Sequence, residues 1–296
     1  MEKILRGFNS FNVVGSAEKI SITPFKNAED GENYEVWRIT TTERSYVLKK
    51  AKNYELEVYS TFFANSVSGA PQYLESVHVD EEDYFLIELV KGRDLCKCDR
   101  ASLKKALDAL IFLQDKYWNA SDRANAGFTF EKSLKGRQDR GKYLCDKELE
   151  AYYNKFLSAY QALPRTLCHD DLLPFNILVS ENSATIIDWE FAGILPYPTS
   201  IARLIAHSEE NDSAFFYMKD EDKRFAIDYY YDNLVKQKGI TYENYRRDLD
   251  LFLFYEYCEW IMLGNKYEDA DMERYESYLE KAKRHLNKEI KYETII

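Results

Sequence analysis

The chain has 296 residues, of which 45% are hydrophobic and 31% are charged, and its formal net charge is −11. These values are typical of a globular protein that is long enough for one large domain or two lobes. The sequence contains no long apolar run and no dense block of basic residues, so we expect no membrane span and no nucleic-acid partner.

The five cysteines are odd in number and scattered along the sequence, which is typical of a reducing compartment. The first residues carry charge, but the apolar stretch of a secretory signal does not follow them. We therefore expect a cytoplasmic protein. We also expect it to be a monomer or a weak dimer.

Residues 18–90 are predicted to form mainly strands, because apolar and polar residues alternate there. Residues 41–44 suit a hairpin turn. The predicted strands are residues 19–23, 34–39, 45–49, 73–79 and 84–89.

A helix is predicted between the third and fourth of these strands. Asn53 can cap its first turn, and the helix then runs to about Asn65. Its apolar face is formed by Leu56, Tyr59, Phe62 and Phe63.

The rest of the chain is predicted to be mainly helical, because apolar residues recur there at helical spacing. The predicted helices are residues 102–118, 143–160, 220–237, 242–262 and 271–287. These patterns predict an α+β protein. It would have a small antiparallel β lobe, residues 1–90, and a larger helical lobe, residues 91–296.

Residues 168–179 contain the most informative pattern in the chain. His169, Asp171 and Asn176 follow the order His-x-Asp-x4-Asn, and Asp188 ends a second β-like run shortly afterwards. A kinase-type phosphoryl-transfer site requires this order and spacing. Asp171 would face an attacking hydroxyl, whereas Asn176 and Asp188 would hold Mg²⁺, which prefers carboxylate and amide oxygens. The structural alternative is an Asp-rich turn between buried strands, and the matching spacing of four residue types argues against it.

Residues 169–178 and 187–190 resemble the aminoglycoside phosphotransferase and choline kinase family, which carries His-Gly-Asp-x4-Asn-Ile-Leu and Ile-Asp-Trp/Phe-Glu motifs. The resemblance extends more weakly over most of the chain. It implies the two-lobed protein-kinase-like fold, ATP (or GTP) as phosphate donor, Mg²⁺ as cofactor and a small-molecule hydroxyl as acceptor. Ser200 stands where the family often has the Asp of Asp-Leu-Ala. A helix histidine that is usual in the family is absent near Leu113, where Gln114 and Asp115 stand instead. These departures concern the subfamily and the substrate.

A kinase-type site also needs a cation that holds the nucleotide phosphates. It should lie on the third strand and pair with a carboxylate of the next helix. Strand alternation favours Lys49 over Lys50 as the residue that faces the cleft. The partner is Glu57 or Glu55, and Glu57 is preferred because it is better placed before Phe62 and Phe63, the apolar pair that anchors the equivalent helix in the family.

The resemblance also places the other nucleotide contacts. Gly31, with Asn33 two residues later, resembles the family's Gly-x-Asn element in the phosphate-covering loop, although a single turn glycine more often only provides a positive φ. Residues 88–90 resemble the hinge whose backbone binds adenine, which makes Glu88 and Val90 candidate contacts. His169 is interpreted as a residue that packs the loop and not as a base.

Two other classes of function compete with a small-molecule kinase. A catalytically silent nucleotide-binding module would have no physical need for Asp171, Asn176 and Asp188 together. A protein kinase would carry a long activation segment and an Ala-Pro-Glu-like anchor after Asp188, and the sequence has neither.

We further expect an acceptor with a positive charge, such as an amino sugar or a choline-like amine. Glu256 and Glu259 stand among aromatic residues at positions 255–260, and carboxylates and rings both attract ammonium groups. The structural alternative is an amphipathic core helix with aromatic packing and a charged outer face.

Overall fold

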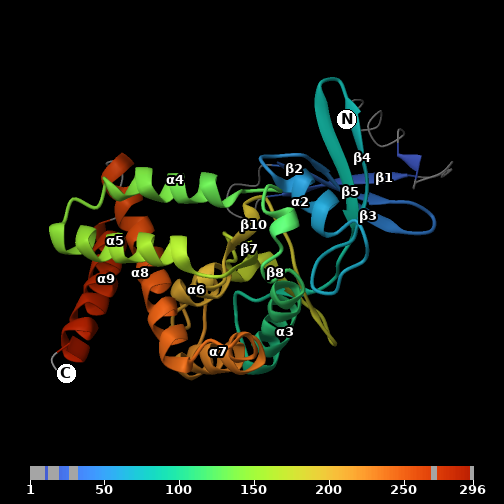
Figure 1. Ribbon diagram of the computed structural model, residues 1–296. Coiled ribbons are helices and arrows are strands. Elements are labelled where there is room, and N and C mark those ends of the chain that lie inside the picture. The colour runs from blue at the N-terminus through green and yellow to red at the C-terminus, as the bar shows by residue number, and fades with distance from the viewer. Residues whose placement is uncertain (1–10, 13–19, 27–32, 268–271, 294–296) are drawn as a thin grey trace.

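A five-stranded antiparallel sheet forms the N-terminal part of the molecule. The computed structural model describes residues 11–12, 20–26, 33–267 and 272–293. The sheet has the strand order β1-β2-β3-β5-β4 and lies apart from most of the helices (Figure 1). Its strands are β1 (Ser21–Lys26), β2 (Asn33–Thr40), β3 (Ser45–Lys50), β4 (Tyr73–Val79) and β5 (Glu82–Glu88).

Side chains alternate along β3, so the sheet has two different faces. Leu48 is fully buried in a small apolar cluster on one face. Val47 and Lys49 point to the other face, where Val47 packs against the main core. Helix α2 (Glu55–Phe62) covers this second face, and the ring of Tyr59 lies 5.4 Å from that of Phe85 in β5. The alternation therefore turns Lys49 towards the rest of the molecule.

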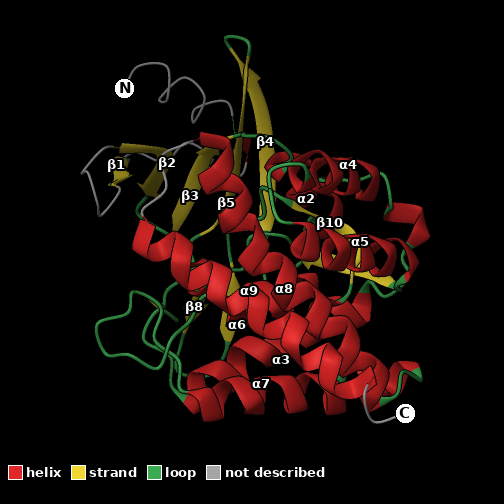
Figure 2. Ribbon diagram, turned by 90° about the vertical axis from the view of Figure 1, so that its left-hand side faces the viewer, coloured by secondary structure: helices red, strands yellow, loops and turns green. Residues whose placement is uncertain are grey.

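Helices dominate the remaining chain. Helix α8 packs against α5, α6 and α9, and Figure 2 shows α8 and α9 running side by side. Across the described ranges, every helix is too short or too polar to cross a membrane. The helices are α3 (Arg100–Lys116), α4 (Phe130–Gly141), α5 (Lys147–Ala162), α6 (Pro198–Ala206), α7 (Asp220–Asn233), α8 (Tyr242–Tyr267) and α9 (Met272–Glu293).

Two small sheets carry the residues of the His-x-Asp-x4-Asn pattern. The chain leaves β7, turns through a short 3₁₀ segment (Pro174–Asn176) and enters β8; Asp188 follows β9. In one sheet β7 (Arg165–His169) pairs with β10 (Ala192–Pro196). The other contains β6 (Arg93–Asp94), β8 (Ile177–Val179) and β9 (Ala184–Ile186).

The predicted α+β class and the kinase-like arrangement are confirmed. All five predicted strands and all five predicted long helices are present, with ends shifted by a few residues. The division at residue 90 stays a prediction; the first sheet ends at Glu88, and α3 begins at Arg100.

One local prediction was wrong, and one helix was missed. Asn53 does not cap α2, because its backbone is left-handed (φ +45°) and its amide reaches Glu190 instead. The residue at the cap position is Tyr54, which makes no side-chain capping bond. In addition, α4 was not predicted, because this helix buries only Phe130, Ser133 and Arg137 and so has no apolar stripe.

Candidate active site

A cleft of about 510 Å³ lies between the five-stranded sheet and the β8–β9 hairpin. The sheet side contributes Lys49, and α2 contributes Glu55. The opposite side contributes Asn176 and Asp188. Three of the residues predicted for phosphate and metal binding therefore meet in one cavity, although they are distant in the sequence.

The loop after β7 is held in place by His169. The buried imidazole donates from Nε2 to the carbonyl of Ile187 (2.9 Å), and its Nδ1 accepts from the backbone N–H of Asp171 (3.2 Å). Burial lowers the pKa of His169, so the ring stays neutral and can keep both roles. The hydroxyl of Ser200 accepts from the backbone N–H of His169 (2.9 Å). The loop that carries Asp171 is therefore fixed from two sides.

Asn176 and Asp188 have the chemistry of a Mg²⁺ site. Asn176 donates its amide Nδ2 to the carbonyl of Asp171 (2.9 Å), which leaves its side-chain oxygen for a ligand. Asp188 sits in the left-handed region (φ +63°), and 46% of its side chain is exposed. Such a backbone is costly for a residue other than glycine and is often found at functional sites. Both side chains offer the hard oxygen ligands that Mg²⁺ prefers.

Lys49 lies between two carboxylates. Its Nζ donates to Glu55 and, at 2.9 Å, to Oδ1 of Asp188. Burial opposes ionisation of Asp188, but Lys49 outweighs this effect and holds the pKa of that carboxyl below its usual value. The neighbouring Lys50 is bound by Glu35 and Glu82 at 3.0 and 2.9 Å. Lys49 is therefore the lysine that reaches Asp188.

The predicted partner Glu57 is wrong, and Glu55 takes its place. Glu57 is exposed, whereas Glu55 is only 1% exposed and contacts Lys49. The reason is helix geometry: residues three, four and seven positions apart share one face. Glu55 therefore shares a face with Val58, Tyr59 and Phe62, all of which are buried, and Glu57 points away from it.

The predicted hinge residues Glu88 and Val90 line the cleft. The backbone N–H of Glu88 already donates to the carbonyl of Gln72 (3.0 Å). Adenine recognition at residues 88–90 stays a prediction. Gly31 lies outside the described residues.

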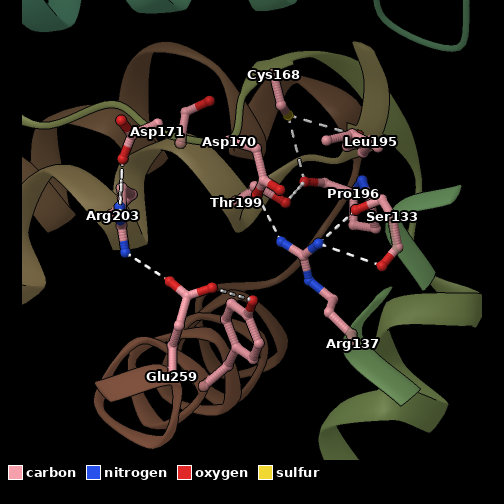
Figure 3. Close-up of polar contacts among 12 residues, drawn as sticks. Ser133, Arg137, Cys168, Asp170, Asp171, Leu195, Pro196, Thr199, Arg203 and Glu259 are labelled. Carbon is pink, nitrogen blue, oxygen red and sulfur yellow. Dashed lines mark hydrogen bonds and ion pairs between the residues drawn. The ribbon is translucent and has the colours of Figure 1, made fainter. Parts of the chain in front are cut away.

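A set of buried arginines beside Asp171 was missed by the sequence reasoning (Figure 3). Arg137 of α4 binds Asp170 at 2.5 Å and stacks on the rings of Tyr160 and Tyr255. Arg203 of α6 binds Asp171 at 2.8 Å. One available signal was Asp170 itself, because it replaces the Gly of the family's His-Gly-Asp motif, and a buried carboxylate needs a cation.

The carboxylates expected to attract a cationic acceptor are paired within the protein. Arg203 binds Glu256 at 2.9 Å and Glu259 at 2.8 Å, and Arg140 also binds Glu259. Burial opposes ionisation of Glu259, but Arg203 and Arg140 lower its pKa to about 2. These two carboxylates therefore no longer support the prediction of a cationic acceptor.

Solved structures with the same fold include kinases and phosphotransferases of small molecules. The chain is similar to choline kinase LicA from Streptococcus pneumoniae (TM-score 0.60, 15% identity, 97% of this chain and 99% of that chain). It is also similar to aminoglycoside-3'-phosphotransferase of type VIII (TM-score 0.54, 14% identity, 85% and 100%). A third similar structure is the amicoumacin kinase hAmiN in complex with AMP-PNP, Ca²⁺ and Ami (TM-score 0.55, 14% identity, 97% and 96%).

A search of curated protein sequences gives no match. The sequence profile of the phosphotransferase enzyme family (APH) matches residues 24–230. This stretch contains Lys49, Asp171, Asn176 and Asp188, and it spans well over half of the chain. The chain therefore belongs to the phosphotransferase enzyme family.

Proposed function

We propose that this chain is an ATP-dependent kinase that transfers the γ-phosphate to a hydroxyl group of a small molecule. The observation that carries the proposal is the position of Lys49, which contacts Glu55 and lies 2.9 Å from Asp188, in the cleft that Asn176 also lines. A lysine, an amide and a carboxylate in one cleft match the needs of phosphoryl transfer, which depends on positioning and charge stabilisation.

Each residue has a distinct role in this proposal. Lys49, held by Glu55, grips the nucleotide phosphates, while Asn176 and Asp188 hold Mg²⁺. Bound there, the ion would supply positive charge that neutralises the phosphate oxygens. Asp171 orients the acceptor hydroxyl and takes its proton. The acceptor oxygen then forms a bond to the γ-phosphorus as the bond to the β,γ-bridging oxygen breaks, and ADP leaves.

The donor and the acceptor are supported to different degrees. AMP-PNP is bound in the structure of hAmiN, which supports ATP as the donor here, with GTP as the alternative. Choline kinases and an aminoglycoside phosphotransferase share the fold, so a cationic amine or an amino sugar remains our first choice of acceptor. All five cysteines are free, which supports the proposal of a cytoplasmic enzyme. We propose that it acts as a monomer or a weak dimer.

An acceptor screen tests the proposed function. Mg²⁺·ATP and Mg²⁺·GTP are incubated with amino sugars, choline-like amines, neutral sugars and nucleosides, and ADP or GDP release is measured. Asp171→Asn serves as the inactive control. Acceptor-dependent release that the Asp171 variant lacks is the expected result. Nucleotide binding without turnover on any acceptor would favour the silent nucleotide-binding module, and activity only with neutral or anionic acceptors would remove the cationic class.

A further inference from the structure

Arg203 is bonded directly to the carboxylate that is proposed to act on the acceptor. Its Nε and Nη2 donate to Oδ1 of Asp171 at 3.2 and 2.8 Å. The guanidinium side chain is 12% exposed, whereas that of Asp171 is 36% exposed. Figure 3 shows Arg203 between Asp171 and Glu259. The carboxylate is therefore more accessible than the guanidinium that holds it.

The other end of the same guanidinium is anchored in α8. Nη1 of Arg203 donates to Glu256 and Glu259 at 2.9 and 2.8 Å, and Glu259 also accepts from the hydroxyl of Tyr255 (2.9 Å). A guanidinium has five N–H donors in one rigid plane. Because both ends of this plane are bonded, Arg203 has little freedom to rotate.

This arrangement determines which oxygen of Asp171 is available. Both bonds from Arg203 go to Oδ1. Among the described residues, no other side chain bonds to the Asp171 carboxylate, so Arg203 alone sets its direction. Oδ2 is left for an acceptor hydroxyl. Catalysis by positioning loses about 10²-fold in rate when a reacting group is misplaced by about 1 Å.

We propose that Arg203 is a positioning residue for phosphoryl transfer, which aims Asp171 at the acceptor by holding one of its oxygens against α8. The inference rests on the proposed function. Arg203 does not line the nucleotide cleft. Its loss should therefore lower kcat and leave the affinity for Mg²⁺·ATP unchanged.

The test compares Arg203→Ala and Arg203→Lys with Arg140→Gln. The control removes another cation that binds Glu259 but does not touch Asp171. Release of ADP from Mg²⁺·ATP is measured with the acceptor found in the screen and, in parallel, with water alone. We expect kcat to fall about 10²-fold in Arg203→Ala. The loss should be smaller in Arg203→Lys, because an ammonium keeps the positive charge but cannot donate two N–H groups from one rigid plane. Arg140→Gln should stay close to wild type.

Rescue by a small molecule separates positioning from a merely structural role. Guanidinium chloride, added well below denaturing concentrations, should restore part of the activity of Arg203→Ala and none of that of Asp171→Asn. If Arg203→Ala does not fold because Glu256 and Glu259 lose their cation, the double variant Arg203→Gln, Glu256→Gln removes one charge of each sign. It should show the same loss of kcat with unchanged nucleotide affinity.

Three results would overturn the inference, and they are distinct. Wild-type kcat in a folded Arg203 variant would show that Asp171 needs no holder. Equal losses of kcat in the Arg203 and Arg140 variants, without rescue by guanidinium, would show that Arg203 has only a structural role. A wild-type protein that releases no ADP with any acceptor or with water would refute the proposed function itself, and this inference with it.

Discussion

Lys49 and Asp188 are 139 residues apart in the sequence, yet Nζ of the lysine lies 2.9 Å from Oδ1 of the aspartate. The bond joins the third strand of the first sheet to the segment that follows the β8–β9 hairpin. It places a cation and the carboxylate that we propose as a metal ligand on opposite sides of one cleft. A nucleotide that enters this cleft meets both groups at once.

Asp188→Ala should abolish the Mg²⁺-dependent part of nucleotide binding, because the variant removes the strongest anionic ligand from the proposed metal site. Asn176→Ala should act in the same direction but more mildly, since a neutral amide contributes less charge. Calorimetric titration of ATP with and without Mg²⁺ measures the effect. If Asp188→Ala binds Mg²⁺·ATP like the wild type, Asp188 is not a metal ligand.

Asp171→Asn should reduce phosphoryl transfer by about 10²–10⁴-fold, which is the usual contribution of a positioned acid or base. The melting temperature should change little, because Arg203 keeps Glu256 and Glu259 as partners. Nucleotide affinity should also stay the same. The measurements are ADP release with a verified acceptor, thermal unfolding and nucleotide titration, and undiminished turnover would remove Asp171 from the mechanism.

The affinity for Mg²⁺·ATP should fall as the pH decreases through 7. Burial raises the pKa of Glu55 from 4.5 to about 7, and Lys49 offsets only part of this effect. Below pH 7, Glu55 therefore takes up a proton and no longer holds Lys49 by charge. The folded state binds this proton more tightly than the unfolded chain does, so the same protonation favours folding between pH 7 and 4.5. Unfolding is therefore not the expected cause.

Glu55→Gln and Glu57→Gln form a matched pair for this pH effect. Glu55→Gln should weaken nucleotide binding and flatten its pH dependence, whereas the exposed Glu57→Gln should behave like the wild type. The comparison also cancels the titration of the nucleotide's own phosphates. A flat profile in Glu57→Gln alone would reverse the assignment of the lysine's partner.

Asp170→Gly should lower the free energy of unfolding by about 3–5 kcal/mol, because it leaves the buried Arg137 without its carboxylate. The double variant Asp170→Gly, Arg137→Leu should recover much of this loss, since no charge then stays buried. Lys135→Ala, which breaks an exposed pair with Asp139 on the same helix, should change stability little. Denaturant unfolding measures all three, and a mild effect of Asp170→Gly would show that Arg137 finds other partners.

The features that could be predicted depend on residues that are close together in the sequence. Strand alternation predicted that Lys49 faces the cleft, because every second side chain on a strand points to the same face. The spacing from His169 to Asn176 fits one turn between β7 and β8, and so short a loop can adopt few conformations.

The features that escaped prediction depend on where helices begin and how they pack. Successive residues of a helix are rotated by about 100°, so Glu57 points away from the buried face that Glu55 shares, although the sequence reasoning preferred Glu57. Arg137 and Arg203 come from helices that meet the loop of Asp170 and Asp171 only in three dimensions. Asp170 signals the need for a cation, but the local sequence does not show which helix supplies it.

The pair formed by Asp170 and Arg137 also constrains how this chain can diverge. A single change at either position leaves a lone charge in the interior, so the two residues should be exchanged together. Related sequences with glycine at position 170 are expected to carry an uncharged residue at position 137, and those with aspartate are expected to keep the arginine. The two positions would thus mark a lineage within the family, recognisable from sequence alone.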